Sequence, residues 1–251
     1  MAGFTKRRRD APPGFFAVEA AGLAWLAQAG GARVVQVLAV GADSITVEQI
    51  DAGAPSSGAA RDFGAALART HAAGAAAFGA GPPGWTGDGF IGDAALPLRG
   101  GPAWGEFYAQ WRVEPYVRTA RDTGALDAAG GSVLDRLCGR LAAGDFDDPA
   151  PPARIHGDLW SGNLLWSPEG AVLIDPAAHG GHRVTDLAML TLFGAPHLPA
   201  IVAGYESASP PLPPGWRDLV ALHQVHPLLV HAVLFGGGYG AQAVAAARHY
   251  V

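Results

Sequence analysis

The spacing of hydrophobic residues changes along this chain and predicts a sheet-and-helix unit followed by a mainly helical one. In residues 13–30 apolar side chains recur every three or four positions, as on one face of a helix, and a glycine pair supplies the stop. Residues 34–40 are rich in β-branched side chains and residues 44–50 alternate between apolar and polar, so two strands are expected there. The following stretch, 51–58, contains Pro, Ser and Gly and predicts a linker.

The remainder of the chain has mainly helical periodicity. Residues 59–73 place Phe63, Leu67 and His71 on one helical stripe, where His71 is expected to be a hydrogen-bonded core histidine. Further helices are expected around residues 104–111, 133–141, 187–193 and 222–235.

Two features of the middle of the chain add detail to this prediction. Residues 79–102 are rich in loops, and their aromatic side chains indicate an ordered loop that faces a substrate. Arg112 and Glu114 are expected to form an ordinary surface pair. The pattern as a whole predicts an α/β (α+β) protein with a small lobe at residues 1–53 and a large lobe at 54–251.

Composition narrows the class of protein. Of the 251 residues 49% are hydrophobic, which is typical of a globular chain. One cysteine, Cys138, excludes an internal disulfide and a cysteine-based zinc site. A net charge of −5 argues against a general nucleic-acid binder, although residues 6–9 form a basic cluster. Gly, Pro, His or a charge interrupts every long apolar stretch, and no signal core follows the basic start, so we expect a cytoplasmic protein without a membrane partner.

The most informative motif lies between residues 155 and 176. His156 and Asp158 form a His-x-Asp triplet, Asn163 follows five residues later, and Asp175 follows after twelve more at the end of an apolar run. Kinase-type phosphoryl transfer needs this ordered set: a carboxylate that faces the substrate hydroxyl, and then an amide and a carboxylate that hold Mg²⁺ against the phosphates. The motif predicts that Asp158 is the catalytic base and that Asn163 and Asp175 are the Mg²⁺ ligands.

Nucleotide-binding residues are expected in the small lobe. Glu19 stands on the apolar stripe of the first helix, and a buried lone carboxylate is costly without a partner. Lys6 lies thirteen residues upstream, and a strand Lys followed by a helix Glu is the ion pair that positions nucleotide phosphates in kinases. The alternative is an exposed Glu near a helix start. The stretch that contains Glu48 and Ile50 leaves the sheet where a kinase offers backbone groups to adenine, so ATP is expected to bind there.

A second polar segment follows the metal-binding motif. His179, His182, Arg183 and Asp186 lie within eight residues, which leaves open a metal-dependent hydrolase as an alternative from another class. No His-x-x-x-His pair supports that alternative. We expect Asp186 to cap the helix at 187–193, Asp186 and Arg183 to brace the catalytic loop, and either histidine to lie near the substrate.

Several of these motifs together resemble the fructosamine kinase (ketosamine-3-kinase) family, which belongs to the aminoglycoside-phosphotransferase-like branch of the protein-kinase fold. The resemblance rests on His156-Gly157-Asp158-Leu159-Trp160-Ser161-Gly162-Asn163, Leu173-Ile174-Asp175-Pro176 and Gly180-Gly181-His182-Arg183. It implies a two-lobe kinase-like fold and Mg²⁺- and ATP-dependent phosphorylation of the sugar 3-hydroxyl of ketosamines. The acceptors implied are fructosamine or ribulosamine, as small molecules or as adducts on protein lysines, and the reaction would destabilise the adduct and reverse early glycation. Trp160 in the catalytic loop is implied on the substrate side.

The chain departs from the family pattern in two places. The family begins with a β-hairpin that bears a Gly-rich nucleotide loop, whereas only five residues precede Lys6 here. We therefore expect an N-terminally truncated small lobe, a displaced or disordered segment at residues 1–9, and weak ATP binding. Val184 stands where the family more often carries Glu. The alternatives are a pseudokinase, a nucleotide-independent binding module, or another aminoglycoside-phosphotransferase-like small-molecule kinase.

Overall fold

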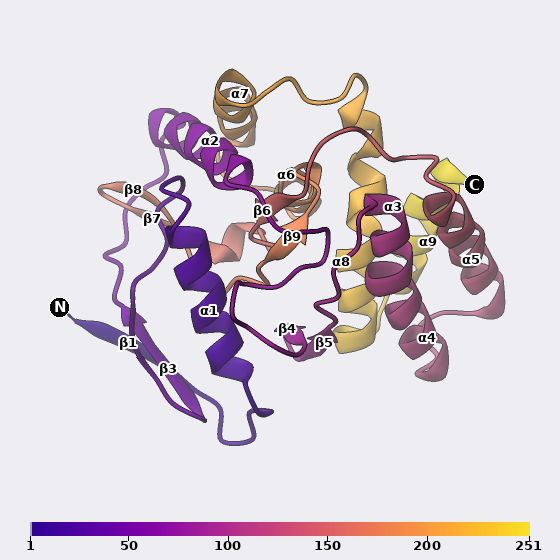
Figure 1. Ribbon diagram of the computed structural model, residues 1–251, viewed down its shortest axis with the longest axis horizontal. Helices are drawn as coiled ribbons and strands as arrows, with labels where there is room; N and C mark the ends of the chain where they lie inside the picture. Colours follow the sequence, from indigo (N-terminus) through magenta and orange to yellow (C-terminus); the bar gives the residue numbers. More distant parts are fainter. Residues whose placement is uncertain (1) are drawn as a thin grey trace.

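The chain begins with a small antiparallel sheet that is covered by one helix (Figure 1). The computed structural model describes residues 2–251. Its first sheet has the strand order β1-β3-β2. The elements of this lobe are β1 (Gly3–Arg7), α1 (Phe15–Ala27), β2 (Val37–Val40) and β3 (Ser44–Glu48). The apolar stripe of α1 meets the sheet through Phe16 and Leu23, which pack with Ile45 and Val47 in one buried cluster.

Every residue of the first strand, β1, pairs with β3. Antiparallel pairing between β1 and β3 extends from Gly3↔Glu48 to Arg7↔Ser44, which places Lys6 opposite Ile45. The prediction of a displaced or disordered segment at residues 1–9 is therefore wrong for residues 3–7. The backbone of this strand pairs with β3, and the side chain of Lys6 forms two ion pairs, so the strand is fixed. Met1 lies outside the described residues.

The second strand begins later than its composition predicts. β2 starts at Val37, whereas Val34 makes an isolated parallel bridge to Leu173 of the large lobe. The backbone N–H of Val35 donates to the carbonyl of Leu173 at 3.0 Å. The β-branched run 34–40 thus serves first as a connection between the lobes and only then as a sheet strand.

The large lobe contains most of the helices and three small two-stranded sheets. Its first half contains α2 (Ser57–Ala72), β4 (Gly89–Ile91), β5 (Ala94–Leu96), α3 (Trp104–Phe107), the π-helix η1 (Tyr108–Val113), α4 (Glu114–Asp122) and α5 (Ala128–Ala142). Its second half contains β6 (Ala153–Ile155), η2 (Ser161–Asn163), β7 (Leu164–Ser167), β8 (Gly170–Leu173), β9 (His179–Gly181), α6 (Val184–Leu192), α7 (Leu198–Ala208), η3 (Trp216–Leu219), α8 (Val220–Phe235), α9 (Tyr239–Ala247) and η4 (Arg248–Tyr250).

Helices α2 and α7 approach each other closely at two glycines. A Cβ at Gly64 would lie 1.9 Å from the carbonyl oxygen of Ile201, and a Cβ at Gly204 would lie 2.0 Å from that of Arg61. Only glycine allows the two backbones to come so near. This packing buries the stripe of α2, and His71 on it is a hydrogen-bonded core histidine, as predicted.

The middle of the chain differs from its prediction in two ways. The loop-rich segment contains a hairpin in which β4 and β5 pair antiparallel from Gly89↔Leu96 to Ile91↔Ala94. Arg112 is not a surface residue: it lies in the π-helix η1, is 1% exposed and is buried in the core, whereas Glu114 is exposed. The prediction of an Arg112–Glu114 surface pair is wrong, because Arg112 lies on the same buried stripe as Trp104 and Tyr108, at spacings of eight and four residues.

The sequence predicts an interruption in every long apolar stretch, but one such stretch is a continuous helix. Residues Trp216–Phe235, which join η3 and α8, are long and apolar enough to cross a membrane by length and composition alone, with a mean hydropathy of 1.3. Half of that stretch is buried inside the molecule. Pro227 and the histidines do not interrupt the helix, which packs against α4, α6 and α9 (Figure 1). This packing explains why the helix is apolar: it is a core helix of the large lobe.

Candidate functional site

The catalytic-motif loop connects β6 to β7 and is held from behind by a buried carboxylate. Asp186 is fully buried, and its two oxygens accept hydrogen bonds from the backbone N–H groups of His156 at 2.8 Å and Gly157 at 3.0 Å. Its partner on the other side is His71, with Nε2 3.0 Å from Oδ2. Asp186 therefore braces the loop, as expected, but it lies inside the first turn of α6 and does not cap that helix, so the capping prediction is wrong.

His156 supports the same loop and does not face a substrate. Its Nε2 lies 2.8 Å from the carbonyl oxygen of Ile174, and its Nδ1 accepts the backbone N–H of Asp158 at 3.2 Å. Burial lowers the pKa of His156, and the nearby Asp186 charge only partly offsets this effect. A neutral imidazole with its proton on Nε2 satisfies both contacts.

Asp158 projects from this loop into a cleft of about 330 Å³. The side-chain amide of Asn163 donates to its Oδ2 at 3.1 Å and to its carbonyl oxygen at 2.8 Å. Burial raises the pKa of Asp158 to about 6; the Asn163 hydrogen bond opposes this effect, and the charges of Asp186 and Asp175 add to it. A carboxylate whose pKa lies near the working pH is suited to receive a proton from a hydroxyl group.

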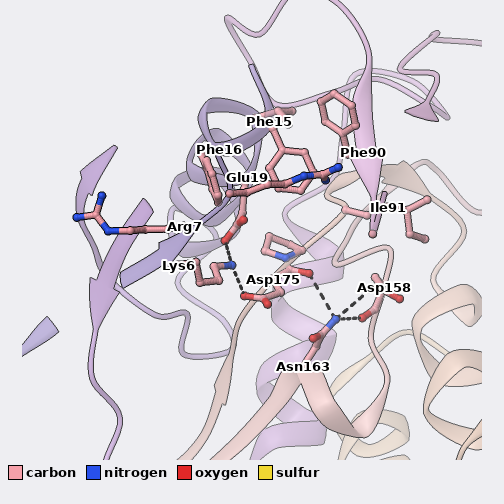
Figure 2. A pocket seen from close by; sticks show the side chains of 15 residues that line it. Lys6, Arg7, Phe15, Phe16, Glu19, Phe90, Ile91, Asp158, Asn163 and Asp175 are labelled. Atoms are coloured by element: carbon pink, nitrogen blue, oxygen red, sulfur yellow. Dashed lines mark hydrogen bonds and ion pairs between the residues drawn. The ribbon is translucent and has the colours of Figure 1, made fainter. Parts of the chain in front are cut away.

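Asp175 faces Asp158 across the same cleft (Figure 2). It follows β8 with a backbone φ of 53°, in the left-handed region that non-glycine residues adopt rarely and mostly where function demands it. Lys6 Nζ donates to its Oδ1 at 2.7 Å. The Asn163 amide also approaches the Asp175 carbonyl, at 3.4 Å.

The donor set fits a magnesium ion. All three hydrogen bonds of the Asn163 side chain are donated by its Nδ2, which leaves Oδ1 available to a cation. Within residues 2–251, Oδ2 of Asp175 takes part in no hydrogen bond or ion pair. One amide oxygen and one carboxylate are hard oxygen ligands, and Mg²⁺ commonly completes its shell with phosphate oxygens and water.

The ion pair predicted between Lys6 and Glu19 is present. Lys6 Nζ from β1 contacts Glu19 Oε1 from α1, and Figure 2 shows the amine held between Glu19 and Asp175. Burial acts to lower the pKa of Lys6, but the Glu19 and Asp175 carboxylates outweigh it and raise the pKa above its ordinary value. Lys6 therefore carries a fixed positive charge at the point where Asp158, Asn163 and Asp175 converge.

A second pocket, mainly apolar, adjoins the cleft. Its volume is about 360 Å³ and it shares Lys6 and Asp175 with the cleft. Its walls are formed by Phe4, Val35, Val47, Glu48, Gln49, Ile50, Leu165 and Ile174. The predicted adenine-binding stretch at Glu48 and Ile50 therefore lines a pocket that opens directly onto the Lys6 amine.

Sequence reasoning missed most of an exposed aromatic cluster beside the catalytic loop. Trp160 is 40% exposed, and its ring lies 6.4 Å from that of Phe193, which lies 5.0 Å from the ring of His231. Phe235 and Tyr239 flank His231 at 5.5 Å and 5.1 Å. Only Trp160 was expected, because the other members come from segments that no local motif connects to it.

Two further predictions for this region are wrong, and the hydrolase alternative gains no support. Neither His179 nor His182 lies near the cleft: they are 3% and 5% exposed, and they face Arg112 and Asp148 respectively. Arg183 does not brace the catalytic loop, because its guanidinium donates to the carbonyl oxygens at positions 210 and 211. Within the described chain, no three His, Cys, Asp or Glu side chains gather as a metal cluster, so the hydrolase alternative has no supporting geometry.

Comparison with known proteins agrees with this geometry. The family model for fructosamine kinase matches residues 2–251. A probable ketoamine kinase of Enterococcus faecium is 31% identical over 244 residues, which cover 95% of this chain and 84% of that protein. A crystal structure of a candidate fructosamine-3-kinase of Thermobifida fusca is 45% identical, with a TM-score of 0.90 over 98% of this chain and 84% of that one. A choline/ethanolamine kinase family protein of Mesorhizobium loti, 16% identical, covers 98% of this chain and 86% of its own with a TM-score of 0.59, which shows a shared kinase-like fold.

Proposed function

We propose that this chain, which belongs to the fructosamine kinase family, phosphorylates the 3-hydroxyl of ketosamines such as fructosamine or ribulosamine. Membership of the family makes it a phosphotransferase with an alcohol acceptor that uses ATP. One observation carries the finer proposal. Asp158 and Asn163 from the β6–β7 loop, Asp175 after β8 and Lys6 from β1 come from three separate segments and converge on one cleft, in the arrangement that phosphoryl transfer to a hydroxyl group requires.

The roles of these residues follow from their surroundings. Lys6, fixed by Glu19, would bind the α- and β-phosphates, while the adjoining apolar pocket would receive the adenine. Asn163 and Asp175 would hold Mg²⁺, which supplies charge neutralisation for the phosphates. Asp175 would hold the metal through Oδ2, while its Oδ1 accepts the hydrogen bond of Lys6.

Asp158 would act on the acceptor. Its partly exposed carboxylate faces the cleft, and the amide of Asn163 fixes its orientation. It would receive the proton of the attacking hydroxyl as that oxygen forms its bond to the γ-phosphorus, while the bond from the γ-phosphorus to the bridging oxygen of ATP breaks and ADP leaves. Asp186 would keep the loop in place from behind without contacting either substrate.

The aromatic cluster supports a sugar-derived acceptor. A Cβ at Gly162 would lie 2.2 Å from the Trp160 ring, so the ring packs closely against the glycine of its own loop. This indole, 40% exposed and two residues after the base in the same loop, would offer an apolar face for the C–H groups of a sugar chain and a π-face for the ammonium group of a ketosamine. Phosphate at C3, next to the C2 carbonyl, would then be a good leaving group, which is the basis for the proposed deglycation of protein lysines in the cytoplasm.

The alternatives are distinguished by a single acceptor panel. ADP release should rise with fructosyl-lysine or ribulosyl-lysine in the presence of Mg²⁺ and ATP, and should stay at background with choline, with kanamycin and with Asp158→Asn. Tight ATP binding without stimulation by any acceptor would indicate a pseudokinase. Preferential turnover of choline or kanamycin would indicate another small-molecule kinase of the same fold, and would overturn the ketosamine assignment.

A further inference from the structure

Arg112 is a buried cation without a carboxylate partner. It is 1% exposed, and in the part of the chain that the structure describes no acidic oxygen lies within 4.0 Å of its guanidinium. Its nitrogens donate to the carbonyl oxygens of Pro97 at 2.8 Å and Trp111 at 3.0 Å, and Nε lies 3.4 Å from His179 Nε2. The remaining nitrogen, Nη2, is buried without any hydrogen-bond partner. A buried charge is costly unless it is paired, so this environment lacks a negative group.

Arg112 belongs to a π-helix. Helix η1 spans Tyr108–Val113 between α3 and α4, and π-helical turns occur frequently at functional sites. The guanidinium lies 4.7 Å from the centre of the Phe107 ring, which offers only a weak attraction. Burial lowers the pKa of Arg112 to about 10, so the side chain keeps its charge at neutral pH.

Two buried histidines of α8 each have one ring nitrogen without a partner. His226 Nε2 and His223 Nε2 are both buried without a hydrogen bond. Arg112, His179 and His226 line one small cavity of about 10 Å³, and His223 packs against Trp104, which lines the same cavity. Burial lowers the pKa values of His179, His223 and His226 well below the ordinary range, so these rings are neutral and Arg112 supplies the charge of the cluster.

We propose that this cavity binds one monatomic, monovalent anion of the size of chloride. The volume is close to the least that holds one particle of the size of a water molecule, which favours a monatomic ion over phosphate or a carboxylate. A water molecule would satisfy hydrogen bonds but would leave the guanidinium charge uncompensated, whereas an anion satisfies both. Nη2 of Arg112 and an N–H at Nε2 of His226 are the donors that would contact it.

The site lies behind the phosphate-transfer cleft and is separate from it. Gly157, which precedes Asp158, forms part of the cavity wall, and its backbone N–H is held on Asp186. The anion would therefore stabilise the packing behind the catalytic loop without contacting a substrate.

Bromide tests the site directly in the wild-type protein. Crystals soaked in sodium bromide should show an anomalous peak, at the bromine edge, within contact distance of Arg112 Nη2 and His226 Nε2. A peak absent at this position, with density for water only, would overturn the proposal.

Chloride dependence of the melting temperature tests it in solution. At constant ionic strength, replacement of gluconate by chloride should raise Tm in the wild type and in Arg118→Met, whose arginine is exposed on α4. The increase should disappear in Arg112→Met. An equal chloride response in all three proteins would contradict the proposal, and if Arg112→Met does not fold, the bromide experiment decides alone.

Discussion

Burial of the Asp158 carboxylate raises its pKa, which suits it to catalysis. The same burial should destabilise the metal-free protein when the carboxylate is charged. Its pKa is raised by burial from 3.8 to about 6, so the folded state disfavours the charged carboxylate. Each pKa unit corresponds to about 1.36 kcal/mol, which gives a cost of about 3 kcal/mol for the full change. Because the carboxylate also faces the water of the cleft, screening reduces this cost, and we expect about 1–3 kcal/mol at neutral pH.

The sign of the pH dependence follows from proton binding. Between about pH 4 and pH 6 the folded protein holds a proton on Asp158 that the unfolded chain has released, so the contribution of this group to stability falls as pH rises. Above pH 6 Asp158 is charged in both the folded and the unfolded state, so its contribution to the unfolding free energy no longer changes with pH. Asp158→Asn keeps the shape of the side chain and can still accept the amide hydrogen bond of Asn163 through its own oxygen, but it carries no charge at any pH. The variant should therefore gain stability over the wild type as pH rises from 4 to 7.

Urea unfolding in the presence of EDTA measures this difference. The difference in unfolding free energy between Asp158→Asn and wild type should grow by about 1–3 kcal/mol between pH 4 and pH 7.5. The matched control is Asp62→Asn, the same substitution at an exposed carboxylate of α2. The same Asp158→Asn protein should lose on the order of 10²–10⁴-fold in turnover. A pH-independent difference for Asp158→Asn would refute the argument that burial strains this carboxylate.

Three further substitutions test neighbouring parts of the site. Asp175→Ala should remove Mg²⁺-dependent ATP binding, measured by calorimetry with and without the metal; unchanged affinity would exclude this carboxylate as a ligand. Asp186→Asn should lower the unfolding free energy by about 2–4 kcal/mol in urea titrations, because a charged acceptor for two loop amides is lost, and an unaltered midpoint would contradict the bracing role. Gly162→Ala should displace the Trp160 ring and lower kcat/KM for a ketosamine by on the order of tenfold while sparing the KM for ATP. Its control, Gly139→Ala, has open space around the new methyl group and should leave both constants unchanged.

The sequence predicted the parts of the site whose residues lie close together along the chain. The motif at residues 156–163 and Asp175 fall within twenty residues, and the strand–turn geometry brings them together without reference to the rest of the fold. Lys6 and Glu19 could be paired because an acid on an apolar helical stripe needs a cation, and the structure contains that ion pair.

The missed features depend on tertiary packing. Arg112 looks like a surface residue by charge, but it shares the buried stripe of Trp104 and Tyr108. His179 and His182 stand next to the motif in sequence, but β9 pairs with β6, and both imidazoles are buried behind the loop. Phe193 and His231 join Trp160 from two helical segments that are far apart in the chain, and a periodicity argument assigns such residues to the core.

The position of the transferred phosphate tests the central proposal most directly. The purified protein would be incubated with Mg²⁺, ATP and fructosyl-lysine, and the product examined by two-dimensional ³¹P–¹H NMR, with Asp158→Asn as the inactive control. We expect a new phosphomonoester signal that correlates with the proton on C3 of the sugar. A signal that correlates with any other carbon-bound proton, or ATP hydrolysis to inorganic phosphate without a phosphorylated sugar, would contradict phosphorylation of the ketosamine 3-hydroxyl.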